Sequence, residues 1–147
     1  MGVTAKKILA PVDRSKYKEK IIEHAISLGK ARAAEIVAIH VIDPGHGVPG
    51  ARIKEKELER EERATKPAHE LLNEVGLLAE REGVRIKKEV VKVSDTVGKA
   101  IIDYAKTNKF DVIIIGTTGM GRVQRMLLGS VANYVIHNAH CSVFAVR

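Results

Sequence analysis

The stretch Asp111-Val-Ile-Ile-Ile-Gly-Thr-Thr-Gly119 decides the fold of this chain. Its apolar part, residues 112–115, is typical of a short strand that is buried on both faces of a sheet. The strand runs directly into glycines, and after nine residues that follow Gly119 the pair Gly129-Ser130 heads a predicted helix. Because such a segment offers backbone N–H groups and the positive end of a helix, we predict that it binds an anion such as phosphate.

The glycines have a physical role in such a loop. Without a Cβ atom, Gly116, Gly119 and Gly129 can adopt positive φ and let the main chain approach phosphate oxygens closely. Ser130 can act as the N-cap of the helix or turn its hydroxyl to a phosphate. The alternative is that the glycines only shape an ordinary strand-to-helix turn. Their combination at the exit of an apolar strand favours the phosphate site.

Two better-known phosphate motifs are absent from the sequence. A P-loop requires Gly-Lys-Ser or Gly-Lys-Thr, whereas Gly29-Lys30 and Gly98-Lys99 are each followed by alanine. The dinucleotide fingerprint G-x-G-x-x-G is missing because Gly116, Gly119 and Gly121 have the opposite spacing. A ligand at this loop is therefore bound in another way.

Strand patterns alternate with helical patterns outward from this segment. Strands are predicted at residues 7–12, 35–42, 84–91, 111–115 and 142–146. Helices are predicted at about 21–33, from about 55 through 78, from 94 through 105, and from 124 or 129 to about 138. This order predicts an α/β fold with a five-stranded, doubly wound parallel sheet. Ligands of such folds bind beyond the carboxyl ends of the strands, where the exits at Asp13 and Gly116 meet.

Residues 44–66 are the least regular segment. Pro44-Gly-His-Gly-Val-Pro-Gly50 is followed by a stretch rich in both signs of charge. We predict a mobile loop that runs into a helix near residue 55, and a lid over the ligand is the alternative.

Composition limits the class of protein. The 147 residues fit one domain, predicted at 1–147. The net charge of +7 is spread along the chain, and with two Phe, three Tyr and no Trp we expect no specific nucleic-acid binding. No run of 18 apolar residues and no signal-peptide pattern occurs, which predicts a soluble cytoplasmic protein without membrane contact. The single cysteine, Cys141, is expected to be a small buried side chain, and His137 and His140 lack a third ligand for zinc.

The chain resembles the ATP-binding branch of the universal stress protein family over nearly its whole length. The family pattern G-x2-G-x9-G-[ST] is complete at Gly116, Gly119 and Gly129-Ser130. The other segments that carry the resemblance are Lys7-Ile-Leu-Ala-Pro-Val-Asp13, Ile39-His-Val-Ile42, Asp111-Val-Ile-Ile-Ile-Gly-Thr117 and Leu127-Leu-Gly-Ser-Val-Ala132.

The resemblance implies a Rossmann-like three-layer sandwich of the adenine nucleotide alpha-hydrolase-like kind. It further implies binding of ATP, or of ADP or AMP, often with a divalent ion such as Mg²⁺ or Mn²⁺, and a homodimer paired through the last strands. By motif match, the residues around the phosphates and ribose are Gly116, Thr117, Thr118, Gly119, Met120, Gly121, Arg122, Gly129, Ser130 and Val131. Pro11, Val12 and Asp13 border the nucleoside in this interpretation, and main-chain atoms of Val41 meet the adenine edge.

The residues support parts of this site independently. Val12, Val41 and Ile115 can supply the apolar walls of an adenine slot. Asp13 can bind hydroxyls or a metal, or it can cap the first helix. The chain departs from the family pattern at Ser142, where a proline is usual, so the pairing at that edge is predicted to shift or to persist in altered register. It also has Arg14 where glycine is usual, which adds a positive charge or replaces a turn glycine.

Three functions follow from these patterns. The first is a nucleotide-responsive regulatory or binding module in stress response, in which ATP orders residues 44–66 or the dimer. The second is a slow ATPase or another nucleotide-dependent enzyme of the same superfamily. The third is a structural dimer with an empty pocket. Near the glycine loop only Asp13, two threonines and two arginines are available for catalysis, which favours the first. The sequence identifies no catalytic residue and no protein partner.

Overall fold

A computed structural model describes residues 5–43, 57–93, 95–118 and 128–147 of the chain. Within these residues, strands and helices alternate along the whole chain. The elements are β1 (Lys7–Pro11), α1 (Lys18–Arg32), β2 (Glu35–Ile42), α2 (Glu57–Arg81), β3 (Lys87–Lys92), α3 (Val97–Thr107), β4 (Val112–Gly116), α4 (Ser130–Asn138) and β5 (Ser142–Val146).

The strands form one parallel sheet in the order β3-β2-β1-β4-β5. The chain starts in the middle of the sheet, moves outward to β3, returns to β4 beside β1 and ends at β5. The direction of winding therefore reverses between β1 and β4, which confirms the predicted doubly wound fold. The carboxyl ends of these two strands are the switch point at which such sheets bind ligands.

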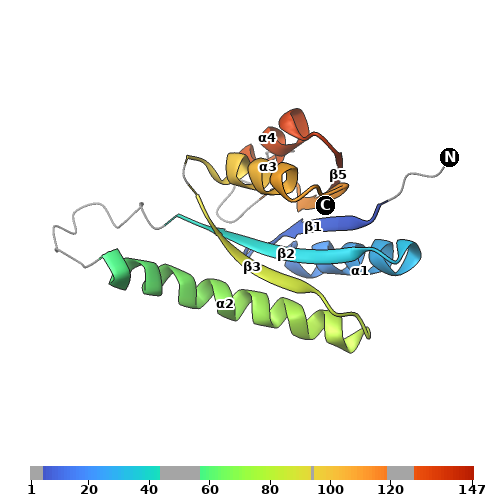
Figure 1. Cartoon of the computed structure of the whole chain (residues 1–147), viewed down its shortest axis with the longest axis horizontal. Helices are drawn as coiled ribbons and strands as arrows, with labels where there is room; N and C mark the ends of the chain where they lie inside the picture. Colours follow the sequence, from blue (N-terminus) through green and yellow to red (C-terminus); the bar gives the residue numbers. More distant parts are fainter. Residues whose placement is uncertain (1–4, 44–56, 94, 119–127) are drawn as a thin grey trace.

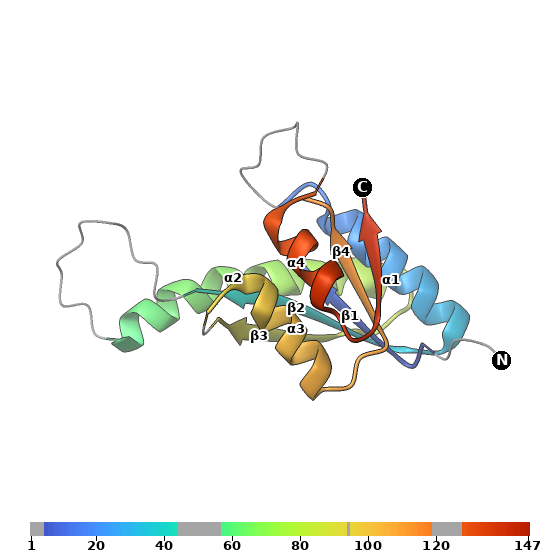
Figure 2. The same ribbon diagram turned by 90° about the horizontal axis from the view of Figure 1, so that it is seen from above.

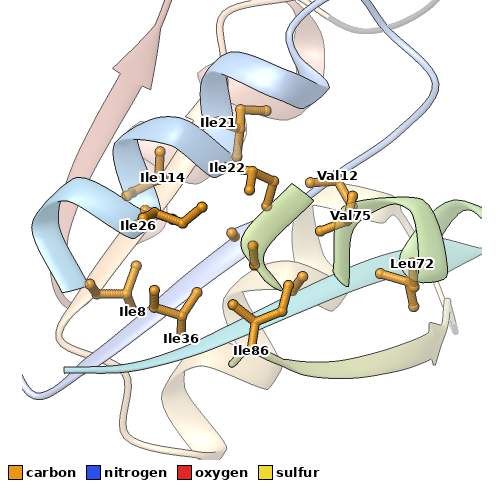
Figure 3. Packing of buried hydrophobic residues seen from close by; sticks show 14 of the residues in the cluster. Ile8, Val12, Ile21, Ile22, Ile26, Ile36, Leu72, Val75, Ile86 and Ile114 are labelled. Carbon is orange, nitrogen blue, oxygen red and sulfur yellow. The ribbon is translucent and has the colours of Figure 1, made fainter. Parts of the chain in front are cut away.

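Helices cover both faces of the sheet, with α1 and α2 on one side and α3 and α4 on the other (Figures 1 and 2). Side chains of β1 alternate between the two layers: Ile8 and Ala10 pack toward α1 and α2, and Leu9 packs toward α3 and α4. Figure 3 shows the first layer, in which Ile22 and Ile26 of α1 and Val75 of α2 belong to one apolar cluster against the sheet.

Several bounds differ from the sequence prediction by one to three residues, and the clearest difference is at β3. β3 begins at Lys87 rather than at residue 84, because Gly83 turns the chain with φ +71° and the Val84 N–H donates to the Ala79 carbonyl at 3.0 Å. Residues 57–66 of the predicted loop segment 44–66 form the first turns of α2, and residues 44–56 lie outside the described residues. None of the helices in the described part of the chain is long and apolar enough to cross a membrane.

Candidate functional site

A pocket of about 270 Å³ opens at the carboxyl ends of β1 and β4. The two strand exits, the end of β2, the first turns of α1 and α3 and the start of α4 all contribute to its wall. The lining residues are Pro11, Val12, Asp13, Ser15, Ile21, His40, Val41, Val97, Ile101, Ile115, Gly116, Thr118, Gly129, Ser130, Val131 and Ala132.

The pocket combines an apolar slot with a polar end. Val12, just after β1, and Ile115 of β4 are almost fully buried, with exposed fractions of 4% and 3%, and Ile101 of α3 belongs to the same apolar cluster as Ile115. The start of α4 closes another side. Apolar walls with a few polar groups are typical of sites for a flat organic ring that carries a charged tail.

The first turn of α4 supplies the polar end. The helix spans Ser130–Asn138, and the N–H groups of its first turn have no acceptor within the helix, so its N-terminus attracts anions. Gly129 is the N-cap, in an extended conformation with φ −72° and ψ 165°, and it makes no side-chain cap bond. Of the two roles predicted for Ser130, that of N-cap is therefore wrong, since Ser130 is the first helical residue. Its side chain is exposed at the pocket rim.

The structure corrects the predicted cradle of free amides around residues 116 and 129. The Gly129 N–H donates to the Thr117 carbonyl at 2.6 Å, and the Thr117 N–H donates to the Val146 carbonyl at 2.9 Å. Thr117 is 7% exposed and does not line the pocket. These two amides hold the loop to α4 and β5, so they are not available to a ligand. Gly119, Met120, Gly121, Arg122 and Arg125 lie outside the described residues.

Glycine at position 116 leaves room for Tyr17, which lies close to it at the start of α1. A Cβ atom on Gly116 would lie 3.0 Å from the Cβ atom of Tyr17 and 3.1 Å from its Cγ atom. Tyr17 stands at the N-cap of α1, and hydrogen bonding with Thr118, then with Thr117, lowers the pKa of its phenol. Tyr17 thus packs against the exit of β4.

Asp13 orders the exit of β1 but does not cap α1. Its Oδ1 accepts a hydrogen bond from the Ser15 N–H at 2.8 Å, and Ser15 Oγ accepts one from the Tyr17 N–H at 3.3 Å. This is an Asx-turn. Arg14, the departure from the family pattern, donates from Nη2 to the Pro67 carbonyl of α2 at 3.2 Å. Its charge therefore lies on the α2 side of the turn.

Several lining residues were not predicted from the sequence. They are Ser15, Ile21, His40, Val97, Ile101 and Ala132. His40 is half-buried, and its Nδ1 lies 2.7 Å from the Val12 carbonyl. The sequence signal that could have identified His40 is that it is a polar residue inside an otherwise apolar strand, next to Val41. The residues of α3 gave no signal, because only the crossover places that helix over the pocket.

Comparisons with known proteins agree with this architecture. The family model of the universal stress protein family matches residues 4–147. Universal stress protein MJ0531 of Methanocaldococcus jannaschii is 39% identical over 146 residues, which cover 97% of this chain and 82% of that protein. The solved structure of MJ0577 is 28% identical, with a TM-score of 0.82 and coverage of 98% and 96% of the two chains.

Two more distant structures carry ligands. A universal stress protein from Archaeoglobus fulgidus was solved in complex with dAMP, with 21% identity, a TM-score of 0.69 and coverage of 98% and 99%. Another universal stress protein was solved in complex with cAMP, with 19% identity, a TM-score of 0.69 and coverage of 98% of each chain. At this identity the likeness is one of fold.

Proposed function

This chain belongs to the universal stress protein family, and on that premise we propose that its pocket binds an adenine nucleotide, ATP in the first place, and that the protein acts as a nucleotide-responsive binding module. The observation that carries the proposal is the placement of an apolar slot beside the N-terminus of α4 at the switch point of the sheet. The slot suits a purine, and the helix N-terminus suits a phosphate.

The bound relatives support the ligand class. The dAMP and cAMP of the two complexes are both adenine nucleotides with a phosphate group. In the present chain, Val12, Ile115 and Val41 are proposed to enclose the base, Asp13 to meet ribose hydroxyls, and the first turn of α4 to bind phosphate oxygens. Gly119, Met120, Gly121 and Arg122 are proposed to complete the phosphate site by motif match.

A divalent ion such as Mg²⁺ or Mn²⁺ fits the site only as a companion of the phosphates. The described residues hold no group of three His, Cys, Asp or Glu side chains that would ligate a metal. Asp13 is the one carboxylate among the lining residues of the described pocket. An Mg²⁺ ion commonly uses one or two carboxylates together with phosphate oxygens and water, so Asp13 is the residue that would meet it.

The same pocket-lining residues favour binding of ATP over its hydrolysis. Hydrolysis of ATP needs a group that positions a water molecule for attack. Among the described lining residues, the Asp13 carboxylate accepts the Ser15 N–H and the His40 Nδ1 is bonded to a carbonyl. We therefore assign the pocket a sensing role, with the catalytic alternative reduced to slow hydrolysis.

We also propose that the protein forms a homodimer through β5. The bond from the Thr117 N–H to the Val146 carbonyl fixes which residues of β5 face β4. Because alternate residues of a parallel strand bond to opposite sides, the main-chain groups of Val143 and Ala145 point out of the sheet edge. Phe144, on the same strand, is 48% exposed.

Isothermal titration of the purified protein with ATP and MgCl₂ tests the nucleotide proposal, and Ser130→Asp is the informative variant. A carboxylate there suits the helix N-terminus but repels a phosphate, so ATP affinity is expected to fall at least about tenfold while adenosine binding is retained. Ser130→Asn, which has the same shape without the charge, is expected to lose at most about threefold. Wild-type protein that releases no adenine nucleotide on denaturation and binds no added ATP would refute the proposal.

A further inference from the structure

The ladder between β1 and β2 changes its partners at the pocket. Pro11 lies opposite Ile39, and the Val12 N–H donates to the Ile39 carbonyl at 2.9 Å, so Val12 lies opposite His40. A regular parallel ladder would continue with a bond from the Val41 N–H to the Val12 carbonyl. Among the described strand ends this bond is not formed. The Val12 carbonyl is bonded instead to His40 Nδ1, at 2.7 Å.

The partner fixes the protonation of the ring. A carbonyl oxygen only accepts hydrogen bonds, so His40 Nδ1 carries the proton and donates it to Val12. The imidazole thereby satisfies the Val12 carbonyl, which in a regular ladder would accept from the Val41 N–H of β2. Val12 itself is 4% exposed, so this acceptor lies in a buried part of the sheet.

Because the Val12 carbonyl is bonded to His40, the main-chain N–H of Val41 has no partner in the described residues of β1. The Glu35 N–H donates to Lys6 of the β1 side, whereas the Ile42 carbonyl accepts from Val93 of the β3 side. Odd-numbered residues of β2 therefore direct their main-chain groups toward β1, and even-numbered residues direct theirs toward β3. Val41 belongs to the first set, at a level where β1 has already ended. Its N–H and C=O are directed to the edge of the pocket that Val41 lines.

We propose that His40 is a positioning residue for base recognition: by occupying the Val12 carbonyl, it keeps the main-chain N–H of Val41 available to the edge of a purine ring, beside the Val41 C=O, which lies past the end of β1. This step rests on the proposed function of the pocket. In one fixed orientation, an N–H and a C=O from the same residue match the acceptor and donor of the adenine edge. The same N–H and C=O do not match guanine, because the hydrogen-bond donor and acceptor are exchanged at that edge of the base.

Amide hydrogen exchange of the ligand-free protein tests the main-chain part of the inference. The Val41 amide is expected to exchange at least about tenfold faster than the Ile39 amide of the same strand, because an unbonded amide lacks the protection of the ladder. Addition of ATP is expected to slow the exchange at Val41. Equal protection of Val41 and Ile39 without ligand would show that the ladder bond is formed after all, and the inference would fail.

Titration of two variants with ATP, GTP and tripolyphosphate tests the recognition part. His40→Leu leaves the Val12 carbonyl free to pair with Val41, so ATP affinity is expected to fall about tenfold and the preference for ATP over GTP to be lost. Tripolyphosphate binding is expected to stay unchanged, because that ligand has no base. His40→Asn places Nδ2 at the position of Nδ1 and is expected to restore both affinity and preference.

The outcomes separate the two proposals. Wild-type protein that binds neither ATP nor GTP would overturn the proposed function of the pocket, and this inference with it. Wild-type binding with an ATP preference that His40→Leu leaves intact would overturn only the role of His40. An equal loss of all three ligands in His40→Leu would also overturn it, since that result indicates a general loss of structure.

Discussion

The two edges of the sheet are built in opposite ways. At the β3 edge, Lys87, Lys88, Glu89 and Lys92 are exposed, and each is bonded to a neighbouring element. At the β5 edge, Phe144 and Ala145 are exposed and apolar. Edge strands carry unpaired main-chain groups, and charged side chains, above all lysines, are a common protection against pairing with another chain.

The bonds of β3 tie its edge to both helix layers. Lys87 pairs with Glu35 of β2 at 3.3 Å, and Lys88 donates to Asn73 of α2 at 3.2 Å. Lys92 pairs with Glu61 of α2, and Glu89 accepts a hydrogen bond from the Tyr104 hydroxyl of α3. These links are individually weak because they are exposed to solvent. Together they keep charged side chains along β3, the strand with which a second chain would have to pair at this edge.

In the described part of the chain, an aromatic contact rather than a charged one links the β5 edge to a helix. The Phe144 ring lies 5.2 Å from the His24 ring of α1, measured between ring centroids. An apolar side chain that is 48% exposed on an edge strand is typical of an interface rather than of a protected edge. The difference between the two edges therefore indicates where the proposed homodimer would pair, at β5 rather than at β3.

The largest effect is expected from a charge placed on β5. Phe144→Lys should convert the proposed homodimer into a monomer, because burial of this side chain from two copies contributes about 3 kcal/mol or more, equivalent to roughly a hundredfold in the dissociation constant. Light scattering coupled to gel filtration measures the change. Lys88→Glu, a charge change on the other edge, is the control and should leave the mass unaltered. A wild-type protein that is monomeric at high concentration would contradict the comparison.

A smaller effect is expected from removing the charges of β3. The triple variant Lys87→Val, Lys88→Val and Lys92→Val should associate further at high concentration, because its edge then resembles that of β5. The matched control replaces the same three lysines by arginine, which keeps the charges. Static light scattering compares the two variants. If both remain at the mass of the wild type, charge is not what protects this edge.

Strand positions were predictable to within one residue except at β3. β2 has the predicted bounds, residues 35–42, and β5 has the predicted bounds, residues 142–146. A continuous run of β-branched and other apolar residues between polar ones leaves little choice of register. β3 was placed three residues too early because Val84 and Ile86 continue the apolar pattern, although Val84 still belongs to the turn after α2. A half-exposed strand gives a weaker pattern, so its ends depend on the turn.

The candidate site was predictable in place but not in detail. The strand exits at Val12 and Gly116 lie in one pocket as predicted, since the βα alternation fixes which edge they share. The sequence does not reveal which main-chain groups are already bonded. Thr117 and Gly129 use their amides within the loop, and His40 uses its ring on the Val12 carbonyl. Such choices depend on distances of a few tenths of an ångström between strands, which no local pattern encodes.

The smallest effect is expected where β3 is tied to α3. The Tyr104 hydroxyl donates to the Glu89 carboxylate, and the Tyr104 ring stacks on Phe110 with centroids 5.8 Å apart. Burial, and after it the hydrogen bond to Glu89, raises the pKa of Tyr104 above its usual value of 10.0. The side chain is half-buried and its hydrogen bond lies near the surface, so Tyr104→Phe should lower the free energy of unfolding by about 0.5–1 kcal/mol near pH 7.

The sign of the pH dependence follows from that shift of the Tyr104 pKa. Because the folded-state pKa is the higher one, the contribution of the phenol is complete below pH 10.0 and is lost as the pH rises above that value. Urea unfolding at pH 7 and pH 11 should show the gap between wild type and Tyr104→Phe closing at the higher pH. Tyr134→Phe, on α4 and away from both edges, controls for the loss of a phenol. A gap of constant size would mean that Glu89 is held at the β3 edge by its lysine neighbours rather than by α3.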